Sequence, residues 1–284
     1  MPRAIDIVIP AYRGLDETRA CVESVLASPV TAAREVVVID DASPEPALSR
    51  WLEGVSGITL IIHTANRGFV ASANEGMRLH PERDVVLLNS DTEVAPGWLD
   101  RIAAHARKDA RVGTVTPFSN NATICSYPRT LERNDLPKGA TTATLDRAFA
   151  AANAGLSSDI PTAVGFCMFI TRECLDRVGL FDEARYGAGY GEEVDFCMRA
   201  SRAGFRHVVA ADVFVRHKGE VSFGDTGTDR RARAQAIVDE LYPEFQPRVR
   251  DFIARDPLAP LRASVDRARA AGSPMARLLG FLRG

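Results

Sequence analysis

The sequence has few cysteines, and they follow no regular spacing. Five occur among 284 residues, an odd number with neither a C-x-x-C pair nor a Cys/His zinc pattern: Cys21, Cys125, Cys167, Cys174 and Cys197. A disulfide framework and a structural zinc site are therefore not expected. The cysteines are instead predicted to be small core side chains of a protein in a reducing, cytoplasmic compartment.

Long apolar runs and a charge of one sign are also missing. The early apolar run at residues 5–9 is short and interrupted, so it predicts no signal peptide, and no uninterrupted apolar stretch reaches the length of a membrane span. The 35 basic residues nearly balance the 37 acidic ones, which leaves a formal charge of −2 and argues against a nucleic-acid partner. An anionic ligand must therefore be bound by a local site.

Two glycine-rich motifs are absent as well. No Gly-x-Gly-x-x-Gly follows a predicted strand, which argues against a nicotinamide dehydrogenase. The segment after the first predicted strand, residues 10–14, is not the Gly-rich basic loop typical of sugar nucleotidyltransferases. The chain does contain 46% hydrophobic and 25% charged residues, the composition of a soluble globular protein with a full core in one or two domains.

Short β-branched runs alternate with helix-period segments through the first half. The predicted strands span residues 5–10, 35–40, 58–63, 84–89 and 112–117. Predicted helices lie between them at residues 15–27, 45–53, 69–79 and 96–107, with Pro96 at the first position of the last one. This order predicts an α/β fold built from βαβ units around a mostly parallel sheet.

The periodicity fails between residues 119 and 161, apart from a short helix predicted at 144–154. We expect binding loops in this irregular segment. Regular patterns then predict a strand at 162–171, helices at 172–178 and 192–203, and a strand at 207–215. A mobile loop is predicted at 221–229, followed by helices over residues 230–254 that are broken by Pro243 and Pro247.

Polar residues gather where four of the predicted strands end. These segments are Pro10-Ala11-Tyr12, Asp40-Asp41-Ala42-Ser43, Asn66-Arg67-Gly68-Phe69 and Asn89-Ser90-Asp91-Thr92-Glu93. Because ligands of open α/β sheets bind at the carboxyl ends of strands, we expect the four segments to border one site. Tyr12 could stack on a base, Asp40 or Asp41 could accept hydrogen bonds from a base or ribose, and Arg67 could reach a base carbonyl or a phosphate. In the alternative interpretation, Asp41 and Ser43 cap the next helix.

Oxygen-bearing side chains directly after an apolar strand suit a hard divalent cation. Asp91 is the first candidate ligand and Glu93 a secondary one, although Asp91 or Thr92 could instead cap a helix after a polar turn. His217, which follows the last predicted strand, could join them as a neutral imidazole or contact a diphosphate as a donor.

A second acidic cluster, Gly191-Glu192-Glu193-Val194-Asp195, lies at the predicted start of a helix. The helix dipole and its free N–H groups favour ionised carboxylates there, as a general base requires. Asp195 and Arg199 are four residues apart and could pair, so we expect one of the carboxylates to be structural. The candidates for the base remain Glu193, Glu192 and Asp195.

Together the motifs resemble, in the same order, those of family 2 glycosyltransferases over about residues 4–220. The matching segments are Ile9-Pro10-Ala11-Tyr12, Val38-Ile39-Asp40-Asp41-Ala42-Ser43, Asn66-Arg67-Gly68-Phe69, Leu87-Leu88-Asn89-Ser90-Asp91-Thr92-Glu93 and Gly191-Glu192-Glu193-Val194-Asp195. The resemblance implies a GT-A fold, a nucleoside-diphosphate-sugar donor, Mg²⁺ or Mn²⁺, and inversion at the anomeric carbon. It also implies a glycosyltransferase domain over residues 1–220, with a nucleotide-binding half (1–118) and an acceptor-binding half (119–220), and a helical extension over 221–284.

The resemblance also implies roles for single residues. The nucleotide would be held by Tyr12, Asp40, Asp41 and Arg67. The rest of the donor would be surrounded by the neighbouring residues of these segments and by Asn89 and Ser90. Asp91 would bind the metal, with His217 beside it or on the diphosphate, and Glu193 would be the base. Two positions depart from the usual family pattern: Asn89 replaces the first Asp of D-x-D, and Glu193 replaces an Asp.

The segment Asn89–Glu93 followed by Pro96-Gly97-Trp98-Leu99 is similar to rhamnosyltransferase-like members. This likeness implies a dTDP- or UDP-sugar donor, with rhamnose as one candidate sugar, and a role in the synthesis of a cell-surface polysaccharide or glycoconjugate. The acceptor could be a glycan, a lipid-linked molecule or a small molecule. The alternatives are a sugar nucleotidyltransferase and a non-catalytic domain that binds nucleotide sugars.

The tail from residue 257 is basic. It contains one acidic residue, Asp266, and five arginines: Arg262, Arg267, Arg269, Arg277 and Arg283. Such a tail could rest on the inner face of a membrane that carries a lipid-linked acceptor, or it could be an ordinary exposed helix. The sequence leaves the oligomeric state open.

Overall fold

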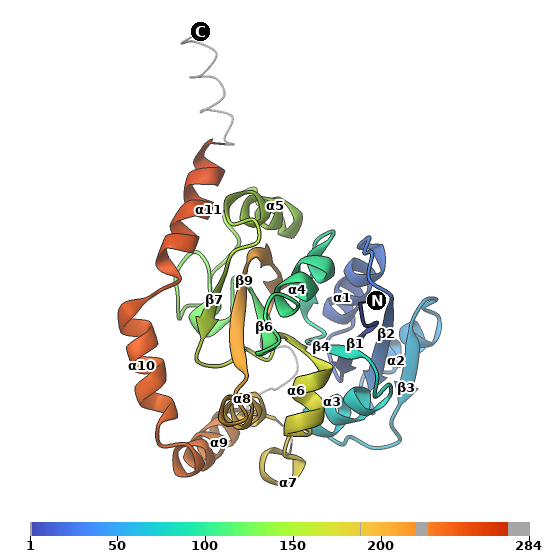
Figure 1. The fold of residues 1–284 in the computed structure, drawn as a ribbon. Coiled ribbons are helices and arrows are strands. Elements are labelled where there is room, and N and C mark those ends of the chain that lie inside the picture. The colour runs from blue at the N-terminus through green and yellow to red at the C-terminus, as the bar shows by residue number, and fades with distance from the viewer. Residues whose placement is uncertain (1, 188, 220–226, 272–284) are drawn as a thin grey trace.

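An eight-stranded sheet forms the centre of the molecule (Figure 1), with the strand order β3-β2-β1-β4-β8-β6-β9-β7. The computed structural model describes residues 2–187, 189–219 and 227–271. The strands are β1 (Ile5–Ala11), β2 (Arg34–Asp40), β3 (Thr59–Ile62), β4 (Asp84–Leu88), β6 (Val112–Phe118), β7 (Ser157–Ile160), β8 (Cys167–Ile170) and β9 (Arg206–Phe214). A second, two-stranded sheet joins β5 (Thr92–Glu93) to β10 (Arg216–His217).

The first half of the sheet is parallel and the second half is mixed. β2, β1 and β4 run parallel to one another, and β3 runs parallel to β2. β8 is antiparallel to both β4 and β6, and β7 is antiparallel to β9. The predicted α/β fold is confirmed, and the parallel arrangement places the ends of β1, β2 and β4 at one edge, as ligand binding there requires.

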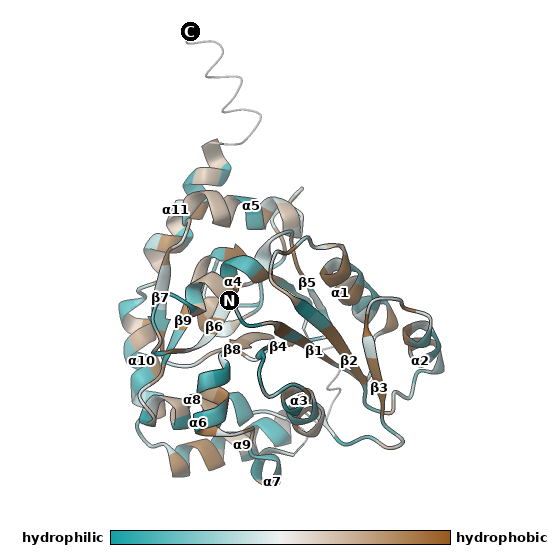
Figure 2. Cartoon of the chain, turned by 45° about the vertical axis from the view of Figure 1, so that its right-hand side comes forward, coloured by the Kyte–Doolittle hydropathy of each residue, from teal (hydrophilic) through white to brown (hydrophobic). Residues whose placement is uncertain are grey.

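Helices cover both faces of the sheet (Figure 2). The reason is that the apolar strand residues point alternately to the two sides. One face is packed by α1 (Leu15–Ala27), α2 (Pro46–Glu53), α4 (Trp98–Ala106), α5 (Thr142–Ala152) and α11 (Ala259–Ala271). The other is packed by α3 (Phe69–Arg78), α6 (Arg172–Val178), α7 (Glu183–Tyr186), α8 (Glu192–Arg202) and α9 (Gly227–Leu241). α10 (Phe245–Arg255) connects α9 to α11, and a 3-10 turn spans Thr123–Cys125.

Several details of the elements differ from the prediction. Helix α4 begins at Trp98, not at Pro96, because Gly97 takes a left-handed conformation with φ of 77° at the N-cap. The strand predicted at 162–171 is limited to residues 167–170. Pro247 does not break α10, because it lies in the first turn, where a missing N–H costs nothing.

Strand β7 was not predicted from the sequence. Its residues Ser157, Ser158 and Asp159 are polar, and the strand pairs only along one side, with β9. A polar edge strand carries no apolar alternation, which is the signal used to recognise strands.

The helices after residue 227 pack against the body of the protein. Ala234 and Val238 of α9 are buried in the core of the second face, and the hydroxyl of Tyr242 donates a 2.6 Å hydrogen bond to Asp195. In α11, the buried Arg262 pairs with Asp256, and Arg269 donates a 2.8 Å hydrogen bond to the hydroxyl of Tyr127.

Parts of two predictions lie outside the described residues: most of the loop predicted at 221–229, and Arg277 and Arg283 of the basic tail. Within the part of the chain that is described, no helix combines the length and the apolar character needed to cross a membrane.

Candidate active site

The loop after β4 is clamped to the end of β10. Asp91 accepts two backbone hydrogen bonds from this segment: its side-chain Oδ2 from the N–H of Gly219 at 2.7 Å, and its carbonyl oxygen from the N–H of Lys218 at 3.0 Å. A Cβ at Gly219 would lie 2.2 Å from Nδ2 of Asn121, and its φ is 75°, so only glycine suits this position. The clamp therefore brings together residues that are more than 120 positions apart in the sequence.

Asp91 and His217 face each other across this clamp. Oδ1 of Asp91 lies 3.4 Å from Nε2 of His217. The other ring nitrogen, Nδ1, is 2.7 Å from the carbonyl oxygen of Asn121, which can only accept, so Nδ1 carries a proton. The ring also stacks on Phe166, with centroids 5.1 Å apart. Nε2 can thus meet Asp91 as part of an imidazolium, or offer a lone pair to a cation once it is neutral.

The charge of Asp91 is maintained despite its burial. Burial raises its pKa, but the neighbouring His217 and the N–H of Gly219 outweigh that effect, so its pKa lies below the usual value. An ionised carboxylate oxygen next to an imidazole nitrogen is a donor set that Mn²⁺ or Mg²⁺ can accept, the imidazole suiting Mn²⁺ better. These two residues therefore fit the divalent cation that the sequence predicts.

The other residues of this loop have different environments. Glu93 lies in β5, and its carboxylate is 3.2 Å from a guanidinium nitrogen of Arg216, so it is engaged in an ion pair. The side-chain nitrogen of Asn89 is 3.5 Å from Nε2 of His217, beside the proposed cation position. Ser90 is buried.

The second acidic cluster lies at the start of α8, as predicted. Gly191 is the N-cap with φ of 86°, and a Cβ there would lie 2.9 Å from Cε1 of Tyr186. In both Glu192 and Glu193, the Oε2 atom is buried and has no hydrogen-bond partner among the described residues. Two such unpartnered carboxylate oxygens are costly to bury, which points to a ligand or a proton at this position.

The environment of the two glutamates opposes the loss of a proton. Burial raises the pKa of both carboxyl groups, and the adjacent charge of Glu193 raises that of Glu192 further, well above the ordinary value. Each carboxylate also opposes the ionisation of the other, because two negative charges would lie side by side in a buried position. Glu192 and Glu193 therefore both remain candidates for a general base.

Asp195 has a structural role. Its carboxylate accepts hydrogen bonds from the hydroxyl of Tyr242 at 2.6 Å and from Nε of Arg199 at 2.8 Å, and the residue is buried. One oxygen thus joins α8 to the end of α9, and the other is bonded to Arg199 within α8. The predicted pairing of Asp195 with Arg199 is observed.

Asp40 and Asp41 at the end of β2 are both buried and fully engaged within the protein. Asp40 accepts hydrogen bonds from the N–H of Ser43 at 2.8 Å and from the hydroxyl of Ser49 at 2.5 Å. It is thus Asp40, not Asp41, that holds the turn into α2. The capping alternative of the sequence analysis is wrong: the N-cap of α2 is Glu45, and no side chain of the described residues caps this helix.

Asp41 holds the segment that carries Arg67. Its carboxylate accepts the N–H groups of Arg67 and Gly68, each at 2.8 Å, and contacts Nδ1 of His63 at 2.7 Å. The other ring nitrogen of His63 is 3.0 Å from Glu75, which also pairs with Arg67 at 2.5 Å. This buried histidine follows β3 directly, yet the sequence offered no sign that it would bridge two carboxylates.

The remaining residues predicted at the donor site lie at the same edge of the sheet. Pro10 and Ala11 are the last residues of β1, and Tyr12 follows, half-buried, with the guanidinium of Arg13 placed 5.4 Å from its ring centroid. The Arg67 side chain is 48% exposed, and Phe69 begins α3. The site also includes Asn121 and Phe166, two residues of irregular segments that no motif pointed to.

Comparison with known proteins identifies the family. The sequence profile described as "Glycosyltransferase like family 2" matches residues 2–236. The chain belongs to the family 2 glycosyltransferases. Among curated relatives of this glycosyltransferase family member, the protein y4gI of Sinorhizobium fredii is 26% identical over 87% of the chain. The pre-mycofactocin glycosyltransferase of Mycobacterium tuberculosis is 27% identical over 72% of the chain. The chain spans only 28% and 40% of the lengths of these two relatives.

Solved structures place the family member in the GT-A fold class. GalNAc-T7 with UDP, GalNAc and Mn²⁺ superimposes with a TM-score of 0.64 at 16% identity, over 94% of this chain and 54% of that one. The mannosyltransferase PcManGT of Pyrobaculum calidifontis with GDP-Man and Mn²⁺ gives 0.56 at 21% identity, over 98% and 78% of the two chains. The predicted GT-A fold is confirmed.

Replacing Glu192 by glutamine is expected to stabilise the protein at neutral and alkaline pH. A carboxyl whose folded-state pKa is raised contributes its full stability only below its unfolded pKa of about 4.3, and this contribution is lost as the pH rises toward the folded pKa. Glutamine has no proton to lose. The melting temperature of Glu192→Gln should therefore match that of the wild type near pH 4 and exceed it by a few degrees at pH 8. The gain in the free energy of unfolding is about 1.4 kcal/mol for each pH unit by which folding raises the pKa of Glu192.

The exposed Glu53 in α2 supplies the matched control, because Glu53→Gln removes a charge that lies in water and is not disfavoured by burial. Its melting curve should follow the wild type at both pH values. A gain for Glu192→Gln of equal size at pH 4 and pH 8 would contradict the explanation from proton binding.

Proposed function

We propose that this protein is an inverting, metal-dependent glycosyltransferase that moves a sugar from a nucleoside diphosphate to an acceptor hydroxyl. The observation that carries the proposal is the pair formed by Asp91 and His217, an ionised oxygen and an imidazole nitrogen 3.4 Å apart at the ligand-binding edge of the sheet. The unpartnered carboxylate of Glu193 at the start of α8 supplies the second requirement, a base.

In the proposed mechanism, each site residue has one task. Asp91 and His217 would hold Mn²⁺ or Mg²⁺, which when bound neutralises the charge on the leaving diphosphate. Glu193 would accept the proton of the acceptor hydroxyl during in-line attack on the anomeric carbon, on the face opposite the leaving group. Burial raises the pKa of Glu193, which makes it a stronger base than an exposed glutamate.

We assign the donor nucleotide to the ends of β1 and β2 and to the segment that Asp41 holds. Tyr12 is half-buried and would stack on a base with the ring face that Arg13 leaves open, and Arg67 is exposed enough to reach a base or a phosphate. Asp40 and Asp41 would act by holding the surrounding turns, since their oxygens already accept several hydrogen bonds. Asn89 and Ser90 would line the diphosphate end, while Glu93, paired with Arg216, is left out of the proposed metal ligands.

A dTDP- or UDP-sugar, with rhamnose as one candidate, remains the favoured donor from the sequence. The structural neighbours were solved with UDP and with GDP-Man, so the fold accommodates more than one nucleotide. A glycan, lipid-linked or small-molecule acceptor in cell-surface glycoconjugate synthesis fits the family. The domain division at residues 118 and 220 belongs to the same proposal.

A nucleotide-sugar screen by thermal shift should identify the donor, because a ligand that binds the native state raises its apparent stability. At a hundredfold excess over the dissociation constant, the gain is about 2.7 kcal/mol, which corresponds to several degrees for a domain of this size. We expect one or a few dTDP- or UDP-sugars to raise the melting temperature only when Mn²⁺ is present. If no nucleotide sugar shifts it, the proposed donor site is wrong.

A membrane contact through the tail is less well supported by the described part of α11. Arg262 is buried against Asp256 and Arg269 bonds to Tyr127, so both arginines serve the protein's own packing. Of the predicted basic residues in the described part of the tail, Arg267 is exposed. Sedimentation with lipid vesicles, with and without residues 257–284, tests the contact.

A further inference from the structure

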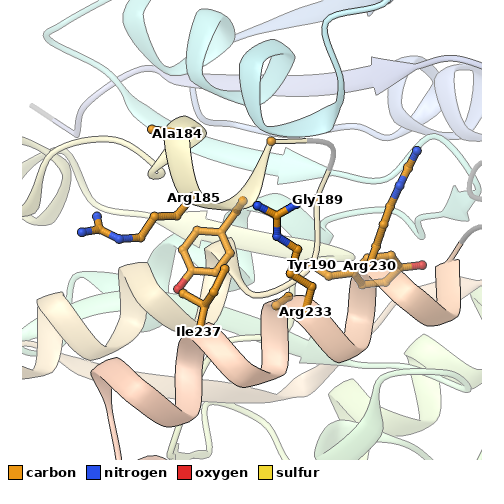
Figure 3. Close-up of a pocket in the computed structure, with 10 residues that line it drawn as sticks. Ala184, Arg185, Gly189, Tyr190, Arg230, Arg233 and Ile237 are labelled. Carbon is orange, nitrogen blue, oxygen red and sulfur yellow. The ribbon is translucent and has the colours of Figure 1, made fainter.

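A cavity lined by arginines lies beside the catalytic helix. It has a volume of about 280 Å³ and lies between α7, the turn leading into α8, and α9. Three of its lining residues are Arg185, Arg230 and Arg233, and none of the described lining residues is acidic. We call it the arginine cavity. Figure 3 shows Arg230 and Arg233 rising from α9 on the side of the turn that carries Gly189 and Tyr190.

Among the side chains that the structure describes, the positive charge of this cavity is only partly balanced. Arg185 forms an ion pair with Asp182. Among the described side chains, neither Arg230 nor Arg233 has an acidic partner, and both are exposed. Guanidinium groups gathered without counter-charges attract anions, and their planar donors match phosphate oxygens.

An aromatic contact joins α9 to the turn that forms the cavity wall. The guanidinium of Arg231 lies 4.8 Å from the ring centroid of Tyr190, and it donates a 3.3 Å hydrogen bond to the Tyr190 hydroxyl. Tyr190 has a φ of 72°, an uncommon conformation for a bulky residue, which costs free energy that the surrounding contacts must offset. Tyr190 is therefore held against α9, beside the arginines.

The cavity adjoins the start of α8. Tyr186 and Ala234 both line it, and a Cβ placed on Gly191 would be 2.9 Å from Tyr186 and 3.3 Å from Ala234. Gly191 is the N-cap of α8 and immediately precedes Glu192 and Glu193. A group bound in the cavity would thus lie beside the N-terminus of α8, the helix that carries the proposed base.

We propose that the arginine cavity binds a phosphoryl or diphosphoryl group of the acceptor substrate, a proposal that rests on the glycosyltransferase function proposed above. Its volume lies just below the range of about 300–1,000 Å³ typical of small-molecule sites, which suits a compact anion better than a whole sugar nucleotide. The donor diphosphate is already assigned to Asp91 and His217. The arginines would hold the acceptor by its phosphate and leave its hydroxyl for Glu193.

The test uses inorganic pyrophosphate, titrated into the full chain by calorimetry with EDTA present so that no cation bridges it to Asp91. We expect the wild type to bind it, and the double variant Arg230→Gln/Arg233→Gln to bind it about tenfold or more weakly, because two charged donors are lost. The matched control Arg250→Gln, an exposed arginine of α10, should bind like the wild type. Asp91→Asn should also retain pyrophosphate binding.

Binding of UDP with Mn²⁺, measured for the same variants, separates the two proposals. Unchanged UDP affinity in the double variant supports an acceptor site, and a tenfold loss would place the arginines at the donor diphosphate and overturn it. Equal pyrophosphate affinity in wild type and double variant would also overturn it. If UDP binds neither the wild type nor any variant, but pyrophosphate binds the wild type more tightly than the double variant, the proposed glycosyltransferase function is wrong and the anion site is supported.

Farnesyl diphosphate in place of pyrophosphate distinguishes the source of the phosphate. Tighter binding of the prenyl compound, lost in the double variant, supports a lipid-linked acceptor. Equal binding of the two compounds supports a water-soluble phosphorylated acceptor.

Discussion

Glu193→Gln is expected to abolish sugar transfer while donor binding survives. General-base catalysis contributes about 10²–10⁴ in rate, and glutamine keeps the size of the side chain without its basicity. The buried Oε2 of Glu193 has no described partner that the substitution would disrupt, so we expect the fold to remain intact. Initial rates of nucleotide release, with calorimetry of the nucleotide in the presence of Mn²⁺, measure the two effects separately.

Two further variants sharpen this test. Glu193→Asp restores the residue usual in the family but withdraws the carboxylate by one methylene group, so we expect partial activity. Glu192→Gln keeps the size of its side chain and leaves the carboxylate of Glu193 in place, so it should retain transfer. Full activity in Glu193→Gln would move the base to Glu192 or Asp195, although Asp195 is already bonded to Tyr242 and Arg199.

The sequence predicts this site well where a motif follows a buried strand. The apolar runs of β1, β2 and β4 end within a residue or two of their predicted limits, so the residues at their ends could be placed at one sheet edge. The start of α8 was predicted from Gly191 and the acidic residues that follow it. These features depend on local periodicity and local backbone preferences, which a sequence displays directly.

The sequence does not reveal which oxygens are already occupied. Asp40 and Asp41 are adjacent and chemically identical, yet one holds the turn before α2 and the other holds the segment at Arg67 and contacts His63. Such roles depend on residues brought together by the tertiary fold. Asn121, which orients His217, lies in an irregular segment that carries no periodic signal.

Asp91→Asn is expected to remove the metal dependence of donor binding. Asparagine keeps an oxygen that can accept the N–H of Gly219, which holds the loop at 2.7 Å in the wild type, but it lacks the negative charge that attracts a cation. Loss of partners outside the inner ligand shell already reduces metal affinity about 10–100-fold in metalloproteins, so loss of a direct ligand should cost at least that much. Calorimetry of UDP or dTDP with Mn²⁺ and with EDTA measures the effect.

The same geometry predicts the opposite effect on metal-dependent nucleotide binding for the substitution Asn89→Asp. The side chain of Asn89 lies 3.5 Å from Nε2 of His217, so a carboxylate there would add an anionic ligand and restore the usual first position of D-x-D. We expect Mn²⁺-dependent nucleotide binding to become tighter than in the wild type, and the double variant Asn89→Asp/Asp91→Asn to recover part of the loss. Nucleotide affinity that is the same with Mn²⁺ and with EDTA in the wild type would reject the metal site. A gain in Asn89→Asp together with a loss in Asp91→Asn would show that the charge of this loop, rather than its shape, sets the affinity for the cation.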